Sequence, residues 1–252
     1  MRQRLLILAL ALLLPSQGWA ALNIVQSQLD ASTTPWATDG IAELTFASDF
    51  TVGNTVCVGF AFDATSRTIN SVEDDGGPTN TYTVASTSEQ AGCCEGWIYC
   101  GVVARAANVV TVTISSALAS TGVLFGWEVG EARASSPVGN TSTNNVASAT
   151  SHPNPSAGTL AMTDATAMLL GFTYGSTGTY TLDAGFTSVW NRNVGTGGSQ
   201  FISSADSMVN TTGGNEGTLN ILVEIRPAAA GGGGAGGAIG NTLNFFRLRV
   251  NP

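Results

Sequence analysis

Residues that could carry nucleophilic or general-base catalysis are scarce in this sequence. The chain contains a single histidine, His152, and no lysine. A serine triad needs a histidine that a rigid scaffold holds beside the nucleophile. His152 instead lies in the segment Ser-His-Pro-Asn-Pro, which predicts an irregular loop. The sequence therefore disfavours a serine hydrolase and leaves carboxylates as the general bases.

Acidic residues could cleave a glycosidic bond if two carboxylates stood about 5 to 9.5 Å apart across it. Glu128 and Glu131 are three residues apart in a predicted strand, so they point to opposite faces. A pairing of Glu128 with Glu224 or Glu43 on neighbouring strands stays open, although no spacing marks it. Acidic residues on solvated strand faces are ordinary, and the sequence favours that interpretation over a glycoside hydrolase.

A turn rich in aspartate and glycine offers oxygen ligands for one cofactor, calcium. Asp74 and Asp75, with Asn80 across the turn, could supply the carboxylate and amide oxygens that this hard cation accepts. The spacing is not that of an EF-hand. Turn chemistry alone also explains the composition. These three residues are therefore the candidate calcium ligands, and a purely structural turn is the alternative.

Four cysteines in a secreted chain predict disulfides. Residues 95 to 100 form an extended run of roughly 3.3 Å per residue, so Cys100 reaches Cys93 or Cys94 only if the chain reverses. We therefore expect Cys57 to pair with Cys100 across neighbouring strands. Cys93 and Cys94 then form a bridge between adjacent residues or remain free thiols. A metal centre is disfavoured, because no Cys-x-x-Cys spacing or companion histidine is present.

Tryptophan and tyrosine side chains are the types that stack on sugar rings. Trp127 falls on the apolar face of its predicted strand, and we expect most of the other rings to lie in the core or at its rim. An exposed aromatic platform is the alternative. Its candidate members are Trp36, Trp97, Trp190, Tyr99, Tyr174 and Tyr180.

The elements that must position these residues are β-strands. In the run 55–62, large apolar residues alternate with small or polar ones, which predicts a strand with one core face. A second run, 122–130, pairs an apolar face with a face that is mostly glycine. Glycine at every other strand position predicts close approach by a ligand, another backbone or a bulky neighbouring loop.

About a dozen such runs, each bounded by turn residues, predict an all-β fold, a two-sheet antiparallel β-sandwich of jelly-roll type over residues 21–227. Two hairpins are expected, one joining 67–72 to 81–86 and one joining 97–105 to 109–114. Residues 133–157 hold serine, asparagine, threonine and proline without periodicity. They predict a long surface connection.

Residues 1–20 have the pattern of a secretory signal peptide, with a positive start, an apolar run from Leu5 to Leu14 and cleavage after Ala20 or Ala21. The run is too short to span a bilayer, and no later segment reaches about 18 apolar residues. We therefore expect a secreted, extracellular or cell-surface protein without a membrane span. Seven arginines then face 17 acidic residues, giving a mature charge of about −10. Such a chain cannot build a surface for nucleic acid.

Six different short motifs follow one another along the predicted strands. They are Gly53-Asn54-Thr55-Val56, Ile69-Asn70-Ser71-Val72-Glu73-Asp74, Asn80-Thr81-Tyr82-Thr83, Ile98-Tyr99, Val110-Thr111-Val112-Thr113 and Trp127-Glu128. In this order they resemble a loose family of secreted bacterial β-sandwich domains, lectin-like or jelly-roll, with the progression GNT, SVTDSxGNTYT, IYYA, TVTV and EYSG. The likeness covers roughly residues 40–226 and implies a fold, with no catalytic residues to transfer. The chain departs from it by a Gly-Pro-Thr insertion in the GNTY turn and by the Cys93-Cys94 pair.

The C-terminal region differs in composition from the rest. Residues 228–240 are rich in glycine and alanine and predict a flexible linker. Residues 241–252 follow as a short strand or tail, in which Phe246, Leu248 and Val250 share one apolar face. Such a strand could pair with an open sheet edge of its own chain or of another copy, or remain frayed.

Three functions follow from these features. The first is non-catalytic recognition or adhesion, in which loops or the glycine-lined face bind a carbohydrate or another cell-surface ligand. The second is a structural subunit that self-assembles by strand exchange. The third is a carboxylate-dependent glycoside hydrolase.

Overall fold

A computed structural model of the chain describes residues 21–32, 34–64, 66–91, 93–118, 121–146, 162–164, 166–175, 180–182, 187–194, 199–205, 208–210 and 218–228. The predicted leader, His152, the linker beyond Ala228 and the C-terminal face of Phe246, Leu248 and Val250 lie outside the described residues. Those expectations therefore stay predictions.

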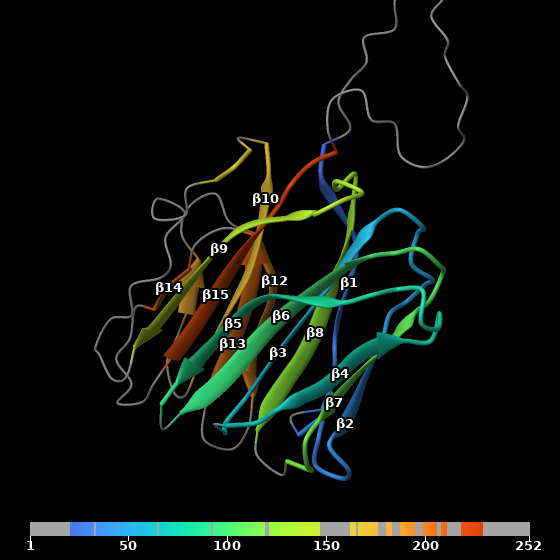
Figure 1. The fold of residues 1–252 in the computed structure, drawn as a ribbon. Helices are drawn as coiled ribbons and strands as arrows, with labels where there is room; N and C mark the ends of the chain where they lie inside the picture. The colour runs from blue at the N-terminus through green and yellow to red at the C-terminus, as the bar shows by residue number, and fades with distance from the viewer. Residues whose placement is uncertain are drawn as a thin grey trace, which may run out of the picture.

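Every regular element in the described part of the chain is a β-strand (Figure 1). The strands are β1 (Asn23–Leu29), β2 (Ile41–Thr45), β3 (Thr55–Phe62), β4 (Ile69–Asp74), β5 (Thr83–Gln90), β6 (Cys94–Val102), β7 (Val109–Ile114), β8 (Gly122–Gly130), β9 (Val138–Val146), β10 (Met168–Gly175), β11 (Tyr180–Leu182), β12 (Thr187–Val194), β13 (Ser199–Ala205), β14 (Met208–Asn210) and β15 (Thr218–Ile225). All pairings are antiparallel. The predicted all-β sandwich is confirmed.

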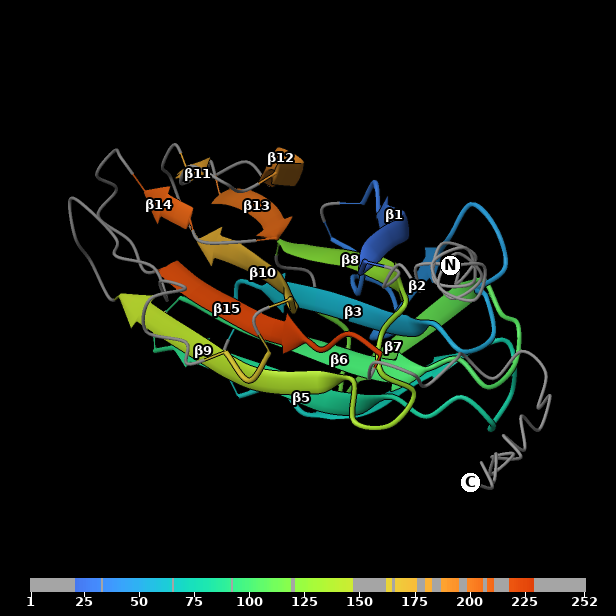
Figure 2. The same ribbon diagram turned by 90° about the horizontal axis from the view of Figure 1, so that it is seen from above.

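Three sheets form the body of the fold. The central sheet has the order β1-β8-β3-β6-β5, the outer sheet β12-β13-β10-β15-β9, and the small sheet β2-β7-β4; a fourth pairing joins β11 to β14. In Figure 1 the small sheet lies in front of the central sheet. In Figure 2 the outer sheet runs alongside the central sheet, and β5 of the central sheet contacts both β9 and β15 of the outer sheet.

The central sheet is buried on both faces, and strand β3 shows why. Val56, Val58, Phe60 and Phe62 pack with the small sheet in one core. Cys57 and Ala61 pack with β10 and β15 in the other. The sequence predicted two sheets, and the structure has a third layer. The small residues on the second face of β3 suggested a face exposed to solvent. In the structure they lie where the outer sheet packs closely on the central sheet.

The two expected hairpins are wrong, because consecutive strands change sheet. Strand β4 pairs with β7 in the small sheet, whereas β5 pairs with β6 in the central sheet. The turn after β4 therefore crosses between layers, as does the connection from β6 to β7. A turn sequence predicts a reversal of the chain without specifying the strand that becomes the partner.

One further expectation is corrected, and one open alternative is decided in favour of a bulky neighbouring segment. The predicted connection 133–157 contains strand β9, whose polar sequence lacks alternation because β9 is an edge strand with mostly exposed positions. The glycine-lined face of β8 is filled by bulky side chains. A Cβ at Gly126 would lie 2.7 Å from Cζ of Phe46, and one at Gly122 would lie 3.1 Å from Cζ3 of Trp36. This face is therefore closed to a ligand.

Candidate functional site

The carboxylates that could have formed a glycosidase pair have structural partners instead. Glu128 is fully buried, and it accepts hydrogen bonds from the Gln26 side chain (2.7 Å), the Thr51 backbone (2.8 Å) and the Asn54 side chain (2.6 Å). It thereby ties the loop before β3 to the central sheet. Glu43 lies on the exposed face of β2.

Glu224 is the second buried carboxylate, on the face of β15 that points away from the central sheet. Burial raises its pKa, but hydrogen bonds from Asn140, Thr163 and Asp164 outweigh burial and hold the pKa below its usual value. The core between the central and outer sheets separates Glu224 from Glu128. The structure does not bring this pair together, so it gives no support to a hydrolase built on it.

The three candidate calcium ligands form a network with protein donors. Asp74 accepts hydrogen bonds from the Asn80 amide (2.7 Å) and the Tyr82 hydroxyl (2.8 Å). The Asp75 carboxylate and the side-chain carbonyl of Asn80 accept hydrogen bonds from backbone N–H groups. The backbone donors around the three residues are Gly76, Ala104, Arg105, Asn108 and Val109. Among the described residues, no group of three His, Cys, Asp or Glu side chains could hold a metal ion. Calcium binding stays a prediction, and turn chemistry accounts for the geometry.

Both disulfides are present. Cys57 of β3 and Cys100 of β6 face each other in the ladder and are joined, as the sequence predicted. Cys93 and Cys94 are joined at the turn between β5 and β6, which resolves the open alternative in favour of a bridge between adjacent residues. No free cysteine remains among the described residues.

The aromatic candidates divide into core residues and a partly exposed pair. Trp36, Trp127 and Tyr174 are fully buried. The side chains of Tyr180 and Trp190 lie outside the described part. Trp97 and Tyr99 are partly exposed, and both pack on the core beneath the small sheet. They are the members of the predicted platform that solvent can reach.

Trp97 and Tyr99 stand two residues apart on β6 and therefore on one face of the central sheet. Phe60, from the neighbouring strand β3, holds both rings from the core side. Its centroid lies 5.4 Å from that of Trp97, with the rings inclined by 24°, and 5.9 Å from that of Tyr99, with the rings inclined by 15°. Such stacked contacts fix the rings beyond what burial alone provides.

Tyr82 extends this line by one position. The next residue on the same face of β6 is Gly101, where a Cβ would lie 2.5 Å from the Thr81 carbonyl oxygen and 3.3 Å from Cδ1 of Tyr82. Glycine is required because the chain and ring of the preceding segment cross there. We call Trp97, Tyr99 and Tyr82 the aromatic row.

The edge strand β5 provides an exposed polar flank to the aromatic row. Val84 lies directly opposite Tyr99, Thr87 opposite Trp97 and Glu89 opposite Glu95. All three β5 side chains are exposed, with Val84 at 53%. The flank therefore presents a methyl surface, a hydroxyl and a carboxylate beside the rings.

Glu95 closes the acidic end of the row. Only 3% of it is exposed. It accepts hydrogen bonds from the backbone N–H groups of Ser66 and Arg67, and Ser66 takes a left-handed conformation (φ 67°). Burial raises the pKa of Glu95, and the nearby Glu89 carboxylate adds to that rise. Glu95 thus fixes the loop beside Trp97.

The tyrosines of the row remain neutral hydroxyl groups around neutral pH. Burial raises the pKa of Tyr99. Burial, the hydrogen bond to Asp74 and the Asp74 and Asp75 charges raise the pKa of Tyr82. Both hydroxyls therefore stay protonated, and the Tyr82 hydroxyl donates to Asp74.

No protein-family model, curated protein or solved structure matches this chain. The resemblance to secreted bacterial β-sandwich domains therefore stays a prediction.

This arrangement can bind a flat apolar face that carries polar groups at its rim. Ring faces contact the C–H surface of a ligand, and neighbouring hydroxyl and carboxylate groups bond to its rim. Sequence reasoning selected Trp97 and Tyr99 but missed Tyr82, Thr87, Glu89 and Glu95. The alternation of Glu95, Trp97 and Tyr99 was visible, whereas the pairing with β5 needed the register.

Proposed function

We propose that this chain is a secreted recognition module that binds a carbohydrate without catalysis, through the aromatic row and its β5 flank. The observation that carries the proposal is the partly exposed pair Trp97 and Tyr99, held in place by Phe60. A large ring that stays partly in water on an ordered strand is the type of group that stacks on a sugar. The exposed Thr87 and Glu89 beside it supply hydrogen bonds.

The charge around the row supports a neutral or cationic sugar over an acidic one. Glu89 and Glu95 face each other at one end, and Asp74 bonds to Tyr82 at the other. The mature chain also carries an excess of acidic residues. Like charges repel an anionic ligand, whereas neutral hydroxyls and amines donate to carboxylates.

The predicted leader and the two disulfides support an extracellular setting, since disulfides persist in oxidising compartments. No helix that is long and apolar enough to cross a bilayer occurs in the part of the chain that the structure describes.

A glycan array followed by calorimetry tests the proposal. Neutral, amino and acidic glycans are screened, and the best neutral ligand is titrated into the mature protein. Thr87→Arg places a long side chain opposite Trp97 without touching the core, and it should weaken binding at least about tenfold, or about 1.4 kcal/mol. Thr45→Arg, on the exposed face of β2, is the matched control and should leave binding unchanged. Equal affinities of the two variants, or binding to acidic glycans alone, would reject the site.

A structural subunit is the second candidate, favoured by the place where the described chain ends. The Ala228 N–H donates to the Glu131 carbonyl, one residue beyond Gly130, and Gly130 pairs with Asn23 of the edge strand β1. The predicted strand in 241–252 therefore follows a point beside an open sheet edge. Removing residues 241–252 should abolish self-association in sedimentation if this candidate holds. Monomers with and without the segment would exclude it.

A further inference from the structure

We propose that the Cys93–Cys94 disulfide is a redox-modification site, at which an external dithiol reduces the folded protein, loosens the β5–β6 turn and weakens carbohydrate binding. The last effect rests on the proposed function. The selective reduction and the loosening of the turn do not.

The two disulfides differ in what they can stabilise. A cross-link constrains the unfolded chain more strongly as the loop that it closes grows. Cys57 and Cys100 are 43 residues apart, so their bridge closes a long loop and constrains the unfolded chain strongly. Cys93 and Cys94 are adjacent and enclose almost no chain. Their bridge therefore adds little to global stability, and its effect is confined to the turn.

The two disulfides also differ in access. Cys57 is fully buried and Cys100 nearly so, between the central and outer sheets. Cys94 is fully buried as well, but Cys93 lies in the turn and is partly exposed. Cys93 packs against the edge of the core but keeps part of its surface in solvent, so we expect a thiolate to reach its sulfur before either sulfur of the core bridge.

The reaction proceeds by thiol–disulfide exchange. A thiolate of the dithiol attacks Sγ of Cys93, the Cys93–Cys94 bond breaks, and Cys94 leaves as a thiolate that takes up a proton. The second thiolate of the dithiol then attacks the mixed disulfide and releases Cys93 as a thiol. The protein gains two electrons and two protons, and the dithiol becomes a cyclic disulfide. A monothiol is less effective, because the adjacent Cys94 thiolate attacks the mixed disulfide at Cys93, re-forms the Cys93–Cys94 bond and releases the monothiol.

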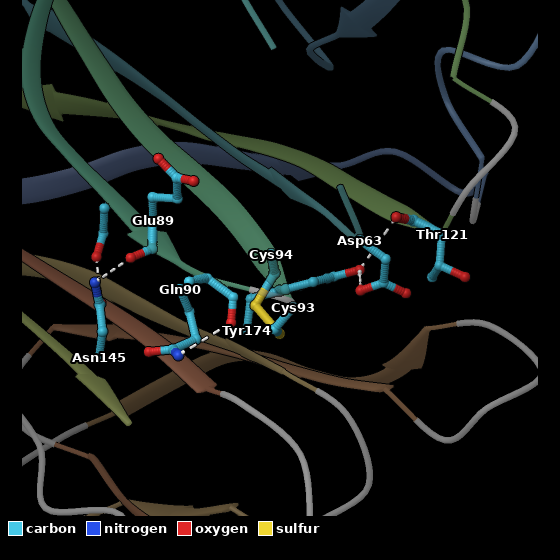
Figure 3. Close-up of a disulfide and its surroundings, with 10 residues drawn as sticks. Asp63, Glu89, Gln90, Cys93, Cys94, Thr121, Asn145 and Tyr174 are labelled. Atoms are coloured by element: carbon cyan, nitrogen blue, oxygen red, sulfur yellow. Dashed lines mark hydrogen bonds between the residues drawn. A yellow bond between two sulfur atoms is a disulfide. The ribbon is translucent and has the colours of Figure 1, made fainter. Parts of the chain in front are cut away.

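Several hydrogen bonds surround the turn that contains the Cys93–Cys94 bridge (Figure 3). The Cys93 N–H donates to the Gln90 carbonyl at 3.0 Å and closes the turn. At the end of β5, just before the turn, the Glu89 carbonyl accepts from the Asn145 side chain of β9 at 2.7 Å, and the Ser88 hydroxyl donates to the same side chain. These bonds link the central sheet to the outer sheet.

The same turn leads directly into the acidic end of the aromatic row. Cys94 is followed by Glu95, which fixes the loop at Ser66 and Arg67. Glu89, opposite Glu95, belongs to the β5 flank. Reduction should therefore increase motion over residues 88–95, while Cys94 stays in the core as a small apolar side chain.

The experiment treats the mature protein with dithiothreitol under native conditions and follows alkylation of each cysteine by peptide mass spectrometry. Cys93 and Cys94 should be alkylated at least about tenfold faster than Cys57 and Cys100. Hydrogen exchange should rise over 88–95, and the affinity for the best neutral glycan should fall. The variant Cys93→Ser/Cys94→Ser should reproduce both effects without reductant, and a monothiol at equal thiol concentration is the reagent control.

Each outcome has one interpretation. Equal alkylation of all four cysteines, or unchanged exchange over 88–95 after selective reduction, overturns the modification site. Unchanged glycan affinity with a loosened turn overturns its link to binding. If neither redox form binds a glycan, the proposed function fails, while selective reduction and faster exchange still support the modification site.

Discussion

The two faces of strand β6 differ in how completely other segments cover them. The closed face, against the outer sheet, consists of Cys94, Gly96, Ile98 and Cys100. The open face consists of Glu95, Trp97, Tyr99 and Gly101. Gly96 lies where another sheet approaches closely, and the large rings of Trp97 and Tyr99 lie where cover is incomplete. Partial exposure of large rings on an ordered strand therefore distinguishes a candidate binding face from a core.

The support beneath the open face should produce the largest effect. Phe60→Ala removes a fully buried ring that stacks on both Trp97 and Tyr99, and it should lower the free energy of unfolding by about 3 to 5 kcal/mol. Urea unfolding measures the change. Phe60→Leu keeps most of the volume and should lose less. A loss below about 1 kcal/mol in Phe60→Ala would show that the rings of the row do not depend on this support.

The closed face should resist even a small addition. A Cβ at Gly96 would lie 2.9 Å from Cδ1 of Leu219 and 3.0 Å from Cζ of Phe172. Gly96→Ala should therefore destabilise by about 1 to 3 kcal/mol in the same assay. Thr87→Ala, on the exposed flank one register position away, is the control and should stay within about 0.5 kcal/mol. Equal tolerance at the two positions would contradict the distinction between the faces.

Thr55 offers a smaller test on the closed side of β3. The alternation in 55–62 suggested an exposed position, but Thr55 is fully buried and its hydroxyl has no hydrogen-bond partner in the described chain. Thr55→Val replaces that hydroxyl with a methyl group of similar size and should stabilise by up to about 1 kcal/mol. Thr55→Ser, which keeps the hydroxyl and loses the methyl, should not. Destabilisation by the valine variant would indicate a partner for the hydroxyl.

The two glutamates with shifted pKa values should respond to pH in opposite directions. The pKa of Glu95 is higher in the folded state than in the unfolded state. Its contribution to folding stability is therefore complete below the unfolded-state pKa and is lost as pH rises through the folded-state pKa. The pKa of Glu224 is lower in the folded state than in the unfolded state. Its contribution to folding stability is therefore present above the unfolded-state pKa and is lost as pH falls through the folded-state pKa. The stability of Glu95→Gln relative to the parent should therefore improve from about pH 4 to about pH 7, and that of Glu224→Gln should worsen. Parallel pH profiles would contradict both assignments.

The strand content was predictable because alternation leaves a local signal, and the Cys57–Cys100 pairing was predictable because an extended run keeps Cys100 away from Cys93 and Cys94. It did not reach the third layer, since the apolar side chains that cover Gly96 and Gly126 come from segments distant in the sequence. It recognised Trp97 and Tyr99 by type alone. Their exposure depends on which strands the small sheet covers, and the changes of sheet after β4 and β6 decide that. Strand β9 was missed because an edge strand needs no apolar face.

Nuclear magnetic resonance of the mature protein tests the central claim most directly. The mature chain has four tryptophans, and the indole N–H signal of Trp97 is assigned by its loss in Trp97→Phe. On titration with a neutral oligosaccharide selected by the array, we expect the Trp97 signal to shift in a saturable manner. The signals of the buried Trp36 and Trp127 should stay in place. Saturable binding with an unmoved Trp97 signal would contradict the assignment of the aromatic row as the binding site.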